Sequence, residues 1–106
     1  MSPERFVAEF KELREYIRNG YFSPDSEISR LQLMRESGFS EAQIGVANKI
    51  VSEALTDALY TVLLGIDGCS AIGSHQEAYR LAGENGERLS GFLETLAWDL
   101  FHGKST

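Results

Sequence analysis

The chain has 106 residues, and its 16 acidic and 10 basic side chains give a formal net charge of −6. Its 42% hydrophobic and 25% charged residues are typical of a folded domain, so the length predicts one domain over residues 1–106 and not a disordered chain. Because binding to phosphate requires clustered Lys and Arg, we do not expect a nucleic acid as partner.

The first predicted helix begins after Ser2, a good N-cap residue, and has Pro3 at its first position, where a missing N–H costs nothing. Its apolar residues recur at helical spacing and form one stripe: Phe6, Phe10, Leu13 and Ile17. We expect Gly20 to end this helix in the left-handed conformation.

A second helix is predicted to begin at Ser23-Pro24 and to close at Gly38, because acidic residues after the proline favour a helix N-terminus. A third begins at the capping box Ser40–Gln43. Its apolar positions continue in phase to Ile66, and after Leu55 extra apolar residues widen that face. We therefore expect a long helix over about 41–67, buried at the centre of the domain with the short helices at its sides.

Residues 74–91 allow two interpretations. Ser74 and Glu77 form a second capping-box pattern, with Gly83 placed to end a short helix. Asn85-Gly86 instead favours a type I′ turn and a short β-hairpin over about 77–91, the interpretation that we prefer. A last helix is expected from Phe92 to Gly103. The predicted fold class is mainly α, a compact bundle of four to five helices around one long central helix, with this short hairpin.

Glu53, Asp57 and Tyr60 are spaced by four and three residues, which places them on one side of the long helix. Two carboxylates in this arrangement can hold a divalent cation, recognise a partner or simply face solvent. Carboxylate-bridged metal centres in helical bundles add Glu-x-x-His pairs, and the sequence contains none. We expect neither a metal ion nor a cofactor.

The sequence gives weak support for an enzyme. Its single cysteine, Cys69, excludes an intrachain disulfide, and it follows a helix C-terminus with Asp67 two residues away. Both neighbours should raise the pKa of the thiol, so a nucleophilic role is not expected. An acid–base pair could be formed by His75 with Glu77 or by Asp99 with His102, but no catalytic motif accompanies either pair.

Trp98 is the only tryptophan and lies off the main apolar stripe of the last helix. It is interpreted either as a core residue or, if it is exposed beside Glu94 and Asp99, as an energetic centre of a binding surface.

All of the net negative charge lies after Arg35, where the chain has ten acidic and four basic residues. We expect a non-catalytic protein-binding module for a basic partner, because complementary charge raises association rate and specificity. Small acidic inhibitors, immunity proteins and antitoxins have this size and charge, although no motif identifies such a family. The candidate partner-binding residues are Glu53, Asp57, Tyr60, Asp67, His75, Trp98 and Asp99.

Two alternatives stay open. The chain is a small helical ligand-binding protein or enzyme that uses the Glu53, Asp57 and Tyr60 stripe, or it forms a homodimer through its long helix.

The longest apolar run, Ala58 to Ile66, is too short to span a membrane, and the N-terminus has no apolar secretory segment. We therefore expect a cytoplasmic protein with no membrane partner.

Overall fold

Four helices follow one another along residues 1–103, the part of the chain that the computed structural model describes. They are α1 (Pro3–Tyr21), α2 (Leu31–Glu36), α3 (Glu41–Ile66) and α4 (Leu93–Phe101), and no strand forms within these residues. The mainly helical class, the long third helix and the helix near the C-terminus confirm the expectations from sequence.

The start of α1 follows from its first residues, whereas its end differs from the prediction. Ser2 is the N-cap, and its Oγ accepts the N–H of Arg5 at 3.0 Å. Gly20 lies inside the helix and does not adopt positive φ, so its predicted role as a left-handed terminator is wrong. A Cβ at this position would lie 2.6 Å from Ile28 Cδ1. Glycine is therefore needed for close packing and not for its backbone freedom.

The second helix begins later than Ser23-Pro24, because residues 22–30 fold into successive turns. Ser26 Oγ accepts the N–H of Ile28 at 3.1 Å, and Ser29 Oγ accepts that of Leu31 at 3.3 Å. Short hydroxyl side chains compete with the helix for local backbone donors in this way. The predicted helix is thereby shortened to α2.

The capping box of α3 is present with both of its hydrogen bonds. Gln43 Oε1 accepts the Ser40 N–H at 2.7 Å, and Ser40 Oγ accepts the Gln43 N–H at 3.1 Å. The helix then runs without interruption to Ile66 and is followed by Asp67 and Gly68, which has φ +79°. Local signals thus define both ends of the longest element.

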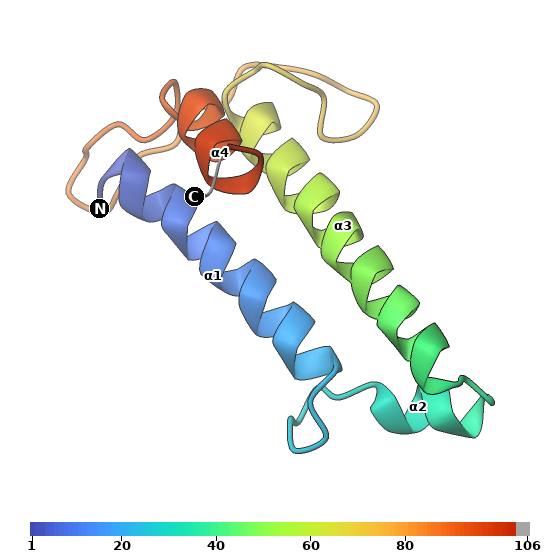
Figure 1. Cartoon of the computed structure of the whole chain (residues 1–106). Coiled ribbons are helices and arrows are strands. Elements are labelled where there is room, and N and C mark those ends of the chain that lie inside the picture. Colours follow the sequence, from blue (N-terminus) through green and yellow to red (C-terminus); the bar gives the residue numbers. More distant parts are fainter. Residues whose placement is uncertain (104–106) are drawn as a thin grey trace.

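α1 and α3 run antiparallel and form one layer, across which α4 packs at the end that holds the start of α1 and the end of α3 (Figure 1). Val7, Leu63, Leu93 and Ala97 form the main core at that end. A separate cluster at the opposite end joins α2 to the start of α3 and contains Leu31, Met34 and Ile44.

The molecule is elongated, with principal extents of 48 × 28 × 28 Å, and α3 is not surrounded by other elements. Val46 and Ile50 on its outer side are 59% and 61% exposed. The expected burial of this helix at the centre of the domain is therefore wrong, because α4 covers only one end of it.

Neither interpretation of residues 74–91 is correct. Residues 71–80 are all exposed and form no helix, since nothing packs on the apolar side that such a helix would have. The expected hairpin is reduced to one antiparallel bridge between Ala82 and Arg88. Its turn is closed by the Gly86 N–H, which donates to Gly83 O at 3.0 Å. Gly86 has φ +85° but Asn85 does not have positive φ, so the turn is not type I′, which requires both.

Candidate functional site

The predicted polar stripe lies on an open helical surface. Glu53 and Asp57 are exposed on α3, and Tyr60, one turn further along, is half-buried. Neither carboxylate takes part in an ion pair within residues 1–103. Two depressions of about 600 Å³ open elsewhere, one beside α2 and one between the end of α3 and residues 78–91, and neither is lined by the stripe.

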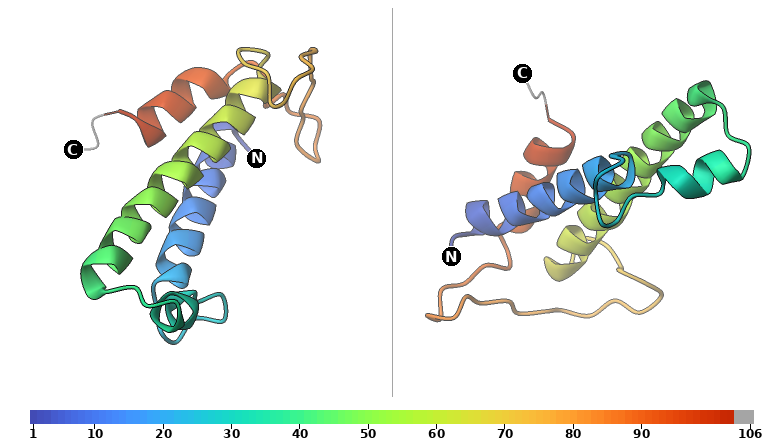
Figure 2. Two further views of the ribbon diagram at one scale, coloured as in Figure 1. Left: turned by 90° about the vertical axis from the view of Figure 1, so that its right-hand side faces the viewer. Right: turned by 90° about the horizontal axis from the view of Figure 1, so that it is seen from below.

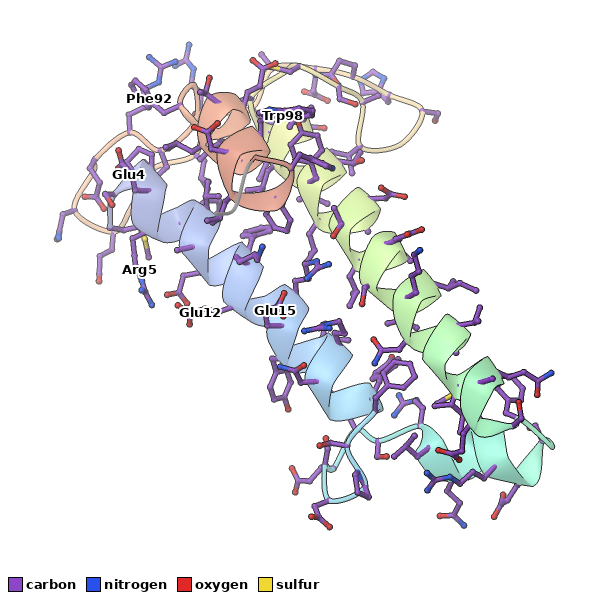
Figure 3. All side chains as sticks on the ribbon, viewed as in Figure 1. Glu4, Arg5, Glu12, Glu15, Phe92 and Trp98 are labelled. Carbon is purple, nitrogen blue, oxygen red and sulfur yellow. The ribbon has the colours of Figure 1, made fainter. Side chains whose placement is uncertain are left out.

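Trp98 extends the stripe from α3 onto α4. Its side chain is 52% exposed, so it does not belong to the core, and its ring centroid lies 6.2 Å from that of Tyr60. Figure 3 shows it on the side of α4 that faces α3. The ring of His102 completes this aromatic cluster, at 4.5 Å from Tyr60 in an edge-on contact and 4.8 Å from Trp98.

Glu94 places a negative charge beside this cluster. Loss of surrounding water and the Glu94 carboxylate together raise the pKa of Tyr60. The same two causes, with a further contribution from Asp67, raise the pKa of the Cys69 thiol. The expected upward direction of the thiol pKa agrees with this, although Glu94 was not foreseen as a cause, and the low reactivity of Cys69 stays a prediction. We call the six residues of this surface the acidic–aromatic patch: Glu53, Asp57, Tyr60, Glu94, Trp98 and His102.

Asp67 binds the backbone at the start of α4, a structural role that the sequence did not indicate. Its carboxylate oxygens accept the backbone N–H groups of Gly91 at 2.6 Å, Leu93 at 2.7 Å and Glu94 at 3.0 Å. The side chain of the α4 N-cap residue, Phe92, offers no such bond. Asp67 therefore caps α4 from the end of α3 and holds Glu94 and Trp98 in place.

The remaining candidates lie apart from the patch. His75 belongs to the exposed segment 71–80, and its Nε2 lies 3.3 Å from a carboxylate oxygen of Glu77. That segment lies on the side of the α1–α3 layer away from α4 (Figure 2). Asp99 is exposed on α4, about 100° further round the helix than Trp98. The structure thus joins Glu53, Asp57, Tyr60 and Trp98 and leaves these two outside.

Sequence reasoning placed Glu94 beside Trp98 and paired His102 with Asp99, but it included neither Glu94 nor His102 among the partner-binding residues. Both are four residues from Trp98, and this spacing places all three on one side of a helix. Their contact with α3 has no comparable local signal, because it depends on how α4 crosses that helix.

Within residues 1–103, no three His, Cys, Asp or Glu side chains are grouped closely enough to hold a metal ion. No helix in this part of the chain has the length and hydropathy needed to cross a bilayer. The cytoplasmic location stays a prediction.

No family model, no curated protein and no solved structure matches this chain.

Proposed function

We propose that the protein is a non-catalytic binding module that recognises a basic protein through the acidic–aromatic patch. The observation that supports this most directly is the exposed Trp98 ring packed on Tyr60, with carboxylates on both contributing helices. An aromatic side chain that is held by its neighbours and still half-exposed resembles the residues that contribute most binding energy in protein interfaces.

The chemistry of the patch suits Arg and Lys side chains. The faces of Trp and Tyr rings attract guanidinium and ammonium groups, and carboxylates add charge-assisted hydrogen bonds to them. Glu53 and Asp57 have no cationic partner within the described residues, so they are available to a partner. The net charge of −6 adds long-range attraction to a basic surface.

We propose an inhibitor-type role for this module, like that of an immunity protein or antitoxin. Such a protein must reach its target quickly, and attraction between an acidic and a basic surface raises the association rate. The alternative role as a ligand-binding protein or enzyme has less support, because Glu53, Asp57 and Tyr60 lie on an open surface and line neither depression.

Calorimetric titration with an Arg- and Lys-rich peptide tests the proposal, with a Glu-rich peptide of equal length as the control ligand. We expect the basic peptide alone to bind, and high salt to weaken its binding by screening. Trp98→Ala should weaken binding about tenfold or more. Charge removal in Glu53→Gln with Asp57→Asn should lower both the affinity and its dependence on salt.

The matched control is Glu27→Gln, which removes one exposed charge far from the patch, in the turn region before α2. Because Trp98 is the only tryptophan, its emission reports directly on contact with the peptide in the wild type. Equal binding of the two peptides, or unchanged affinity in Trp98→Ala, would contradict the proposal.

A further inference from the structure

The middle of the α1–α3 layer contains no buried side chain. Between Val7 and Gly20 on α1, and between Ile44 and Leu63 on α3, every residue is at least partly exposed. Two helices alone cannot enclose a core, because each needs a further layer over its apolar side. The two clusters at the ends of the layer supply that cover only locally.

The two sides of this middle region differ in chemistry. On the α4 side the helices are joined by Arg14, whose Nε donates to Thr56 Oγ1 at 2.6 Å and whose Nη2 donates to Ser52 O at 3.3 Å. The other side carries apolar residues from both helices, beside the ion-paired Arg5, Glu9 and Glu12 of α1, and we call its apolar part the free face. Its members are Leu13, Tyr16 and Ile17 from α1 and Val51, Leu55 and Ala58 from α3.

Helix geometry places these residues away from α4. Leu13 lies about 120° round α1 from Val7, which packs against α4. Leu55 lies about 140° round α3 from Tyr60, whose ring contacts Trp98 of α4. Segment 67–92 lies on the same side of the layer but only at one end, near the end of α3 and the start of α1 (Figure 2). The rest of the free face has no cover from the described chain.

The exposed area of the chain is large for its mass. It amounts to 7054 Å², whereas a folded monomer of 11.8 kDa exposes about 5,900 Å². The excess of about 1,150 Å² comes partly from the elongated shape and the exposed segment 71–80, and it is larger than the roughly 800 Å² that each partner buries in a standard stable interface. Leu13 and Tyr16 on the free face are 44% and 61% exposed, so burial there removes apolar area from water.

The charge distribution favours a second copy of this chain as the occupant of the free face. α1 has four acidic and four basic residues, and Glu9 and Glu12, which lie one turn before Leu13 and Tyr16, are both paired with Arg5. The charged residues in the middle of α3, Lys49, Glu53 and Asp57, are on the side of that helix away from the free face. Two copies can therefore approach through this face without opposing their acidic regions.

We propose that the protein forms a symmetric homodimer in which the free faces of two α1–α3 layers pack together as a four-helix bundle. Paired helical hairpins form such bundles when each contributes an apolar side, and a symmetric pair uses the same face on both subunits. The acidic–aromatic patch stays accessible on each subunit. The dimer would thus present two binding surfaces for a basic partner.

Size-exclusion chromatography with light scattering tests the dimer over a tenfold range of protein concentration. We expect a mass of about twice 11.8 kDa for the wild type and 11.8 kDa for Leu13→Arg and for Ala58→Arg. Both positions are exposed in the single chain, so an arginine there fits the folded monomer, and circular dichroism checks that the helices persist.

Val46→Arg is the matched control. This residue is 59% exposed on α3 and lies about 180° round the helix from Leu55, so its substitution should leave the mass of the dimer unchanged. Trp98→Ala should also leave the mass unchanged, which separates the dimer from the proposed binding function. A wild type that stays at 11.8 kDa at every concentration overturns the proposal, as does equal dissociation in Val46→Arg.

Discussion

Removal of the Asp67 carboxylate should loosen α4 from the rest of the molecule. Three backbone N–H groups donate to this carboxylate, at 2.6, 2.7 and 3.0 Å, and they belong to Gly91, Leu93 and Glu94. Hydrogen bonds to a charged group contribute about 1.5–3 kcal/mol each, and loss of a helix N-cap costs about 0.5–2 kcal/mol. Because Asp67 is partly exposed, water replaces some of what is lost.

We therefore expect Asp67→Ala to lower the free energy of unfolding by about 2–3 kcal/mol, and Asp67→Asn, which keeps one acceptor oxygen, by about 1 kcal/mol. Urea unfolding followed by circular dichroism and by the emission of Trp98 measures both effects. Because Trp98 lies on α4 whereas most helical signal comes from α1 and α3, its transition should come at lower urea in Asp67→Ala.

Asp57→Ala provides the control, since Asp57 is exposed and accepts no hydrogen bond within the described residues, and its effect should stay within about 0.5 kcal/mol. If Asp67→Ala unfolds no more easily than Asp57→Ala, the carboxylate does not hold α4 and the argument from these three bonds is refuted.

Three further predictions concern other parts of the chain. Gly20→Ala should destabilise the fold by about 1–3 kcal/mol in thermal unfolding, and less in an Ile28→Ala background, because its Cβ would meet the Ile28 side chain at 2.6 Å. Burial works to raise the pKa of Glu15, but hydrogen bonds from two arginines outweigh it and hold that pKa below 4.5. A carboxylate with a lowered pKa in the folded state stabilises the fold above its unfolded pKa and loses this effect as pH falls through the folded pKa. Glu15→Gln should therefore lose less stability than the wild type when urea unfolding is repeated below pH 4.5. Cys69 should be alkylated by iodoacetamide more slowly than an unfolded control peptide at mildly alkaline pH, and Glu94→Gln should speed the reaction, because Glu94 raises the pKa of the thiol.

Each of these has an outcome that would contradict it. Equal destabilisation by Gly20→Ala with and without the Ile28 side chain would show that this contact is not the cause. If Glu15→Gln loses as much unfolding free energy as the wild type below pH 4.5, the ionised Glu15 carboxylate does not stabilise the fold through its arginine partners. Alkylation of Cys69 at the rate of the unfolded peptide would contradict the raised pKa of the thiol.

The ends of the helices could be predicted where short-range chemistry determines them. Ser2 and Ser40 each accept a backbone N–H three residues ahead, which is a contact within one turn and is visible in the sequence. The same reasoning failed at Ser23-Pro24, where Ser26 and Ser29 bind nearby N–H groups and turns form instead. The helix-start signal at Ser23-Pro24 and the turn-forming hydroxyl groups of Ser26 and Ser29 favour different local structures, and the sequence did not show which of them forms.

The candidate site could be predicted only in part for a related reason. Helical spacing placed Glu53, Asp57 and Tyr60 on one side of α3, and the structure agrees. The contact of Tyr60 with Trp98 depends on the crossing of α4 over α3, and Asp67 fixes that crossing through bonds to residues far along the chain. No local pattern carries that information.

The sequence by itself determined the helical class, the bounds of the long helix and the excess of acidic charge after Arg35, because these follow from periodicity, capping and composition. Only the tertiary structure decided that Trp98 is exposed against Tyr60, that residues 71–80 form no regular element, and that one side of the α1–α3 layer is left without cover. The physical reason is that burial depends on what packs against a surface. A helix that is apolar nearly all round requires cover, and the sequence of one chain does not state what provides it.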